Sequence, residues 1–247
     1  MEIKNIFEIE IEGAASTLDA IDFIPQYTEA VSKFLRDHQS SMGNEWVKQT
    51  AGKLYKLTKN NEGTVLGSSS DIGAFIATYT KIPLITGQQL LSFYEQGENK
   101  NPFGNVYIDF GVQINGLPKV NKYQAETLLK DLSDREIEIG EGRVPNFSQL
   151  RLIADKESDS GLAYRLADNV ENSEDVSQTS AYPFLFVGKD GLFRAYLCRD
   201  TWDACVDILS YFSDDGRVVR YDAEGVVPAK KERDLVSELT GKFIRKF

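Results

Sequence analysis

A glycine-containing segment in the first half of the chain has the residue types of a phosphate-binding turn. Gly67 and Gly73 flank a run of serines, and a short apolar stretch, residues 65–66, precedes them. A turn of this kind brings backbone N–H groups and the N-terminus of a helix towards an anion, such as the pyrophosphate of a dinucleotide. Gly67, Ser69 and Gly73 are therefore the candidate cofactor-binding residues.

The glycine spacing resembles the cofactor-binding turn of short-chain dehydrogenases over residues 65–77, a resemblance that implies a nicotinamide cofactor on these glycines. Asp71 stands where that family has its middle glycine, and its carboxylate would lie near the anion. The family's Tyr-x-x-x-Lys pair follows the turn, whereas Tyr55 and Lys59 precede it. We therefore interpret the segment as a helix start capped by a serine, and expect no cofactor.

Three acidic side chains in the second half have a spacing that resembles the calcium loop of EF-hand proteins. Asp155, Glu157 and Asp159 place carboxylate oxygens at the first, third and fifth positions of such a loop. The glycine comes one residue late, at Gly161, and Leu166 stands where the loop needs its final glutamate. These three residues are the candidate metal ligands, but the pattern favours a polar hairpin loop, and we expect no bound metal.

Two further features have a simpler structural explanation than a catalytic one. Residues 109–111, Asp-Phe-Gly, resemble the magnesium-binding triplet of protein kinases, but residues 81–101 contain neither the Asp nor the His of a kinase catalytic loop. Alternating apolar residues at 106, 108 and 110 predict a strand instead. His38 is the only histidine, and its place near the end of a predicted helix favours a structural role.

The composition is that of an ordinary globular protein, with 41% hydrophobic residues and a formal net charge of −10. The acidic balance argues against direct nucleic-acid binding, because phosphates need a basic surface. The chain has no apolar run of the roughly 18–20 residues that a membrane helix needs, and its first residues lack the apolar core of a secretory leader. Cys198 and Cys205 are too few for a disulfide framework, so we expect a cytoplasmic protein.

The periodicity of the apolar residues predicts a mixed α+β fold with largely antiparallel sheet segments and about five to seven helices. Predicted helices cover about residues 25–38, 46–57, 72–79, 86–97, 121–132, 200–212 and 229–245. Predicted strands cover about residues 7–11, 105–114, 136–139, 150–154, 162–166, 184–187, 192–197 and 217–221.

The second half is richer in strands than the first, which favours two lobes. A helix-rich lobe is predicted over residues 1–133 and a hairpin-rich lobe over residues 134–247, with a single domain as the alternative. The second lobe carries an acidic loop at residues 169–180 and a basic helix at its C-terminal end.

Three classes of function stay open on these observations. The acidic body and the lack of a recognisable catalytic set favour a protein-interaction or regulatory protein, of the inhibitor, immunity or adaptor type. A subunit of a larger homomeric or viral-type assembly is the first alternative, because the edge-like strand at residues 7–11 and the basic helix suit contact with a neighbour. An unrecognised enzyme that uses carboxylates in a cleft is the second.

Overall fold

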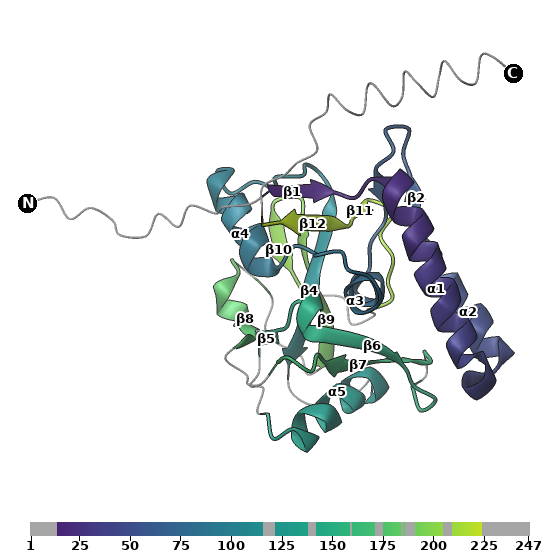
Figure 1. Ribbon diagram of the computed structural model, residues 1–247. Helices are drawn as coiled ribbons and strands as arrows, with labels where there is room; N and C mark the ends of the chain where they lie inside the picture. Colours follow the sequence, from purple (N-terminus) through teal and green to yellow (C-terminus); the bar gives the residue numbers. More distant parts are fainter. Residues whose placement is uncertain are drawn as a thin grey trace, which may run out of the picture.

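The computed structural model describes residues 14–115, 122–137, 142–158, 160–170, 175–183, 185, 191–204 and 209–223 (Figure 1). Over these residues the fold is a mixed α+β arrangement with largely antiparallel sheets, which confirms the predicted fold class. No helix in these ranges is long and apolar enough to cross a membrane.

The central sheet is built on two long antiparallel strands, β4 (Tyr107–Asn115) and β9 (Gly191–Cys198). The strand order is β10-β9-β4-β5-β8, and β11 (Gly216–Arg217) pairs in parallel with the start of β4. The short members are β5 (Arg143–Val144), β8 (Ser177–Gln178) and β10 (Thr201–Asp203). Nearly all residues of β4 and β9 are buried, because this sheet is covered on both faces.

The Asp-Phe-Gly triplet lies inside β4, where the register with β9 shifts between Asp109 and Gly111. Such a shift marks a β-bulge. A Cβ atom on Gly111 would lie 2.4 Å from the carbonyl oxygen of Pro145, so the strand needs glycine at this close approach. The strand predicted over residues 105–114 is confirmed, and the Asp-Phe-Gly triplet forms the β-bulge in that strand.

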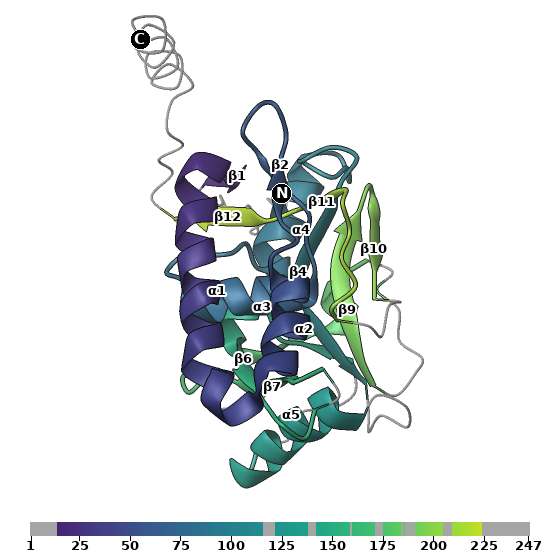
Figure 2. The same cartoon turned by 90° about the vertical axis from the view of Figure 1, so that its right-hand side faces the viewer.

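The helix that follows the glycine segment, α3 (Ser70–Tyr79), lies in the middle of the molecule. α1 (Ala20–Met42) and α2 (Asn44–Leu54) cover it on one side, and the β4–β9 sheet lies on the other (Figure 2). Phe75 packs edge-on against Tyr27 and Phe34 of α1, with ring centroids 5.6 and 5.5 Å apart. Every residue from 70 to 76 is buried, so this helix has no solvated face in its first two turns.

Smaller elements surround this core. α4 (Gly87–Gln96) begins at the capping box that Thr86 and Gln89 form, as its sequence predicts. β1 (Ala14–Thr17) pairs with β12 (Val219–Asp222), and β2 (Thr58–Lys59) pairs with β3 (Val65–Leu66). β6 (Leu150–Ala154) and β7 (Leu162–Leu166) form a hairpin against which α5 (Lys122–Asp134) packs. The 3₁₀ turns are Phe147–Gln149 and Thr179–Ala181.

The main hydrophobic cluster takes residues from both sides of the predicted lobe boundary. Phe75, from the first half, belongs to the same cluster as Leu150 and Tyr164, from the second. A smaller cluster joins α4 to the outer part of the central sheet through residues such as Leu90 and Trp202. The division of the chain into two lobes stays a prediction.

The helix predicted over residues 200–212 is wrong where the structure describes it. Thr201–Asp203 form β10, which pairs back onto β9 across the two-residue turn at Arg199 and Asp200. Arg199 has a φ of 54°, the left-handed conformation that such tight hairpins use. Trp202 lies in an aromatic cluster with Tyr94, Phe110 and Tyr182, and this packing decides its conformation.

The first helix also begins earlier than predicted. Its N-cap is Asp19, whose side chain accepts the Ile21 N–H, so Pro25 lies inside the helix rather than at its start. The strand expected at residues 7–11, the helix expected at residues 229–245, and Cys205 and Asp159 lie outside the described residues, as do parts of the strands expected at 136–139 and 184–187.

Candidate functional site

The backbone N–H groups of the glycine segment already have hydrogen-bond partners inside the protein. Gly67 donates to the carbonyl oxygen of Gly216 at 2.8 Å, and Ser68 donates to that of Ser213 at 3.1 Å. The Ser69 hydroxyl accepts the Ile72 N–H at 3.2 Å and so caps α3. An anion would have to displace these bonds in order to bind here.

The space above both glycines is filled by aromatic rings. Gly67 has a φ of 97°, and a Cβ atom there would come within 2.0 Å of the Phe212 ring. A Cβ atom on Gly73 would come within 2.4 Å of the Phe147 ring. Each glycine therefore allows close packing of a side chain from elsewhere in the chain.

Asp71, in the first turn of α3, is buried at 1% exposure. Its Oδ1 accepts the Tyr164 hydroxyl at 2.5 Å, and its Oδ2 has no hydrogen-bond partner among the described residues. Burial raises the pKa of this carboxyl, while the Tyr164 hydrogen bond and the charge of Lys53 oppose the shift. No described cavity opens onto Asp71, so the group is a buried part of the core.

A second buried carboxylate, Asp109 on β4, forms an ion pair with Arg194 on β9. Both side chains are at most 3% exposed, and Arg194 Nη2 donates to Asp109 Oδ2 at 2.8 Å. The guanidinium also lies 4.9 Å from the centre of the Tyr196 ring. The pair satisfies both charges inside the protein, which leaves neither of them directed at a ligand.

Two of the three candidate metal residues, Asp155 and Glu157, line a polar pocket of about 320 Å³ near α5. Asp155 Oδ1 accepts the Glu157 N–H at 2.9 Å, and its Oδ2 accepts the Thr127 hydroxyl at 3.0 Å, so the carboxylate organises its own loop. Lys130 and Arg165 share the pocket with the acidic residues. Within the described ranges, no group of three or more His, Cys, Asp or Glu side chains is placed to hold a metal ion.

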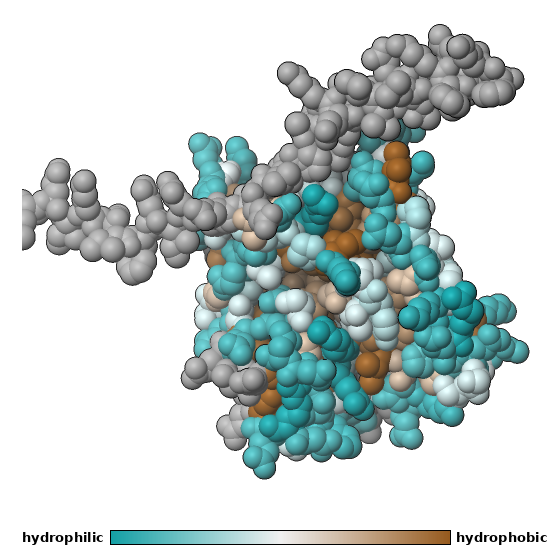
Figure 3. Space-filling model, in the orientation of Figure 1, coloured by the Kyte–Doolittle hydropathy of each residue, from teal (hydrophilic) through white to brown (hydrophobic). Residues whose placement is uncertain are grey.

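The largest described pocket that the sequence did not indicate is a groove of about 400 Å³ between the start of α1 and β12. Figure 3 shows apolar residues in the hollow between these two elements, with hydrophilic residues around them. The groove is lined by Leu18, Asp19, Asp22, Phe23, Gln26, Lys81, Ile82, Pro83, Arg220, Tyr221 and Asp222.

Backbone hydrogen bonds hold the walls of this groove. Tyr221 N–H donates to the carbonyl oxygen of Pro83 at 2.9 Å, and Ile85 N–H donates to that of Val219 at 3.0 Å. The loop before α4 therefore extends the β1–β12 pair on its other edge. Because both walls are tied to regular structure, the groove is formed before any ligand binds.

The floor of the groove is apolar, and its rim carries charges of both signs. Leu18 and Phe23 are buried, and Ile82 is half-buried. In the described part of the chain, the Lys81 ammonium and the Arg220 guanidinium form no ion pair or side-chain hydrogen bond. Two cations without a partner beside an apolar floor suit a ligand that carries both an apolar group and a carboxylate.

Comparisons of the chain with protein-family models, with curated proteins and with solved structures each find no match. The groove was missed from the sequence because its residues come from three separate segments, each of which has a local role in a helix, loop or strand. The one available signal was the charged and apolar mixture of residues 81–83, which helix and strand periodicity do not explain.

Proposed function

We propose that this chain is an acidic, cytoplasmic protein of the interaction or regulatory type, acting as an inhibitor, immunity factor or adaptor through the groove between α1 and β12. The observation that carries the proposal is the combination in this groove of an apolar floor with two cations, Lys81 and Arg220, that form no ion pair with any described residue. Its volume suits a few side chains of a partner, and its walls need no ordering when the partner binds.

The expected partner presents an apolar side chain next to a carboxylate. The apolar side chain would contact Leu18, Phe23 and Ile82, and the carboxylate would pair with Lys81 and Arg220. Charge pairs at a partly exposed rim mainly set specificity and the association rate, while burial of the apolar group supplies most of the affinity.

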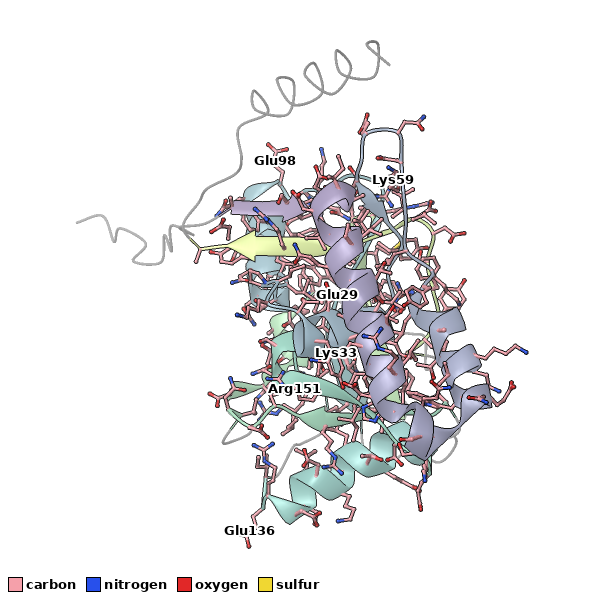
Figure 4. The ribbon with its side chains drawn as sticks, turned by 45° about the vertical axis from the view of Figure 1, so that its right-hand side comes forward. Glu29, Lys33, Lys59, Glu98, Glu136 and Arg151 are labelled. Carbon is pink, nitrogen blue, oxygen red and sulfur yellow. The ribbon has the colours of Figure 1, made fainter. Side chains whose placement is uncertain are left out.

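The test is a quantitative pull-down from an extract of the source cells with three forms of the tagged protein. The forms are the native chain, the double variant Lys81→Glu/Arg220→Glu, and the control Lys59→Glu. Lys59 lies on the β2 hairpin and does not line the groove (Figure 4). A stoichiometric partner should be retained by the native and control proteins and lost by the double variant. Recovery of no such partner, or equal recovery by all three, would contradict the proposal.

A homomeric assembly is the second candidate, and the outer edge of β1 favours it. β1 pairs with β12 on one edge, and no described strand lies on its other edge. The Leu18 N–H donates to the Val218 carbonyl oxygen. Because backbone N–H and C=O groups alternate between the two edges of an antiparallel strand, those of Ala15 and Thr17 are directed to the open edge. A molecular mass by light scattering that stays monomeric over a wide concentration range would rule this candidate out.

A further inference from the structure

We propose that the partner binds the groove between α1 and β12 through a dipolar segment, in which a basic and an acidic side chain flank the apolar one. The existence of a partner belongs to the proposed function, on which this inference rests. The charges on the two walls of the groove indicate the pattern that such a partner carries.

One wall of the groove is a face of the small sheet that β12 forms with β1 and with the loop before α4. Arg220 and Leu84 form an antiparallel bridge, so their side chains lie on the same face of this sheet. Leu84 packs against the main hydrophobic cluster, as does Ile82, two residues earlier. Val219 and Ile85 point the other way, into the smaller cluster. Arg220 is therefore directed to the side of the sheet on which the groove lies.

This sheet wall is mainly basic. Lys81 and Arg220 line it, and neither side chain forms a hydrogen bond or an ion pair within the described ranges. Asp222 also lines it, and this carboxylate already has a hydrogen bond or an electrostatic contact. A negatively charged group in the groove is therefore attracted to the two cations.

The opposite wall, formed by the start of α1, is acidic. Asp22 and Gln26 lie one helical turn apart on the same side of α1, and both line the groove. Their side chains are exposed and bond to no described residue. Asp19 also lines this wall, but its Oδ1 accepts the Ile21 N–H as the cap of the helix. Asp22 is thus the carboxylate that can receive a basic group.

Opposite charges therefore face each other across the groove without meeting. Asp22, Lys81 and Arg220 line one cavity of about 400 Å³, yet none of them forms an ion pair with another described residue. The buried side chains of Leu18 and Phe23 lie in the floor. A ligand of one sign would be attracted by one wall and repelled by the other, whereas a dipolar ligand is attracted by both.

Asp22 also has a structural role that needs no partner. It lies in the first turn of α1, where a carboxylate interacts favourably with the helix dipole. Such a role predicts that Asp22 affects stability and leaves the choice of ligand unchanged. A test of the dipolar segment must therefore measure specificity.

The test titrates the isotope-labelled, full-length protein with short peptides and follows the NMR signals of the groove residues. The peptides are acetylated and amidated, so that only side chains carry charge. Lys-Leu-Glu and Glu-Leu-Lys are the dipolar probes, and Glu-Leu-Glu and Lys-Leu-Lys are the probes of one sign. We expect one dipolar peptide to bind about fivefold more tightly than either peptide of one sign, the size of one partly exposed charge pair. Equal or tighter binding of Glu-Leu-Glu, or no shift of the groove signals by any peptide at millimolar concentration, would overturn the proposal.

Charge variants of α1 test the role of Asp22. In Asp22→Lys the tightest peptide should become Glu-Leu-Glu, and in Asp22→Asn the dipolar and the doubly acidic peptides should bind about equally. Glu29→Lys is the control, because Glu29 is exposed on the same helix and does not line the groove (Figure 4). It should keep the native order of affinities. An unchanged order in Asp22→Asn, with the thermal transition retained, would assign Asp22 to the helix alone.

The pull-down described above, with Asp22→Lys added, separates this inference from the proposed function. If the partner is lost with Lys81→Glu/Arg220→Glu but retained by Asp22→Lys, the proposed function stands and the dipolar segment fails. If the peptides show the dipolar preference while no partner is recovered, the recognition of a dipolar segment stands and the proposed function fails.

Discussion

The hydroxyl of Tyr164 donates a hydrogen bond of 2.5 Å to Asp71, and both side chains are buried in the main core. The bond joins the first turn of α3 to β7 across 93 residues of sequence. The second carboxyl oxygen, Asp71 Oδ2, has no partner in the described part of the protein. A carboxyl group held this way favours its neutral form, because an apolar core solvates a charge poorly.

The first prediction concerns the pH dependence of stability. Burial raises the pKa of Asp71 in the folded state above its value in the unfolded state. Between these two values the folded protein binds more protons, so the free energy of unfolding falls as the pH rises through the interval, and the loss is complete above the folded-state pKa. Asp71→Asn removes the titrating carboxyl and with it this pH-dependent loss of stability. Relative to the native protein, the variant should therefore gain stability as the pH rises above the ordinary range of an aspartate carboxyl.

Urea denaturation across that pH range checks this expectation, with Asp168→Asn as the control, since Asp168 is exposed. A parallel pH profile for Asp71→Asn and the native protein would contradict it. Tyr164→Phe removes the donor and leaves both oxygens of Asp71 without a partner, which should cost about 1–3 kcal/mol when the carboxyl is charged. In the Asp71→Asn background the same substitution should cost less.

The second prediction concerns the buried ion pair between Arg194 and Asp109. Arg194→Met leaves the Asp109 carboxylate buried without its partner, and we expect a loss of about 3–5 kcal/mol in the free energy of unfolding. Arg151→Met is the matched control, because Arg151, labelled in Figure 4, is half-buried and among the described residues bonds to the nearby carbonyls of Ser148 and Leu150. If both variants lose the same stability, the pair is not responsible. Chemical denaturation measures both, and the double variant Arg194→Met/Asp109→Leu should recover much of the loss.

The third prediction compares two helical glycines. Gly52 in α2 has nothing within 4 Å of the position of a Cβ atom, so Gly52→Ala should raise the free energy of unfolding by about 0.5–1 kcal/mol through helix propensity. Gly73→Ala places its methyl group against the Phe147 ring and should lower stability by about 1–3 kcal/mol. Thermal denaturation distinguishes the two signs. Phe147→Leu should relieve part of the cost of Gly73→Ala, and a stabilising Gly73→Ala would show that the ring moves freely.

The fourth prediction concerns the capping box of α4. The Thr86 hydroxyl accepts the Gln89 N–H at 3.3 Å, and the Gln89 side chain accepts the Thr86 N–H at 2.9 Å. Thr86→Ala should therefore cost about 1 kcal/mol, and Thr86→Ser should retain most of the stability. Equal losses in the two variants, measured by urea denaturation, would assign the effect to the methyl group rather than to the cap.

Much of the local structure follows from the sequence because its causes are local. The cap at Thr86, the serine cap of α3 and the alternation of β7 each depend on residues a few positions apart. The helix expected at Trp202 failed for the opposite reason. The apolar residues around Trp202 fit a short strand as well as a helix. Trp202 packs against Tyr94 and Tyr182, which are distant in sequence, and these contacts favour the strand.

The candidate sites show the same difference between local causes and contacts that join distant segments. By itself the sequence determined the fold class, the capped start of α3 and the departures from dehydrogenase, kinase and EF-hand patterns, because these depend on residue types and short spacings. Only the tertiary structure decided that Phe212 and Phe147 fill the space above Gly67 and Gly73, and that Asp71 bonds to Tyr164. It also decided that Lys81 and Arg220 line the same groove. Each of these depends on contacts between distant segments, which no local period of the sequence encodes.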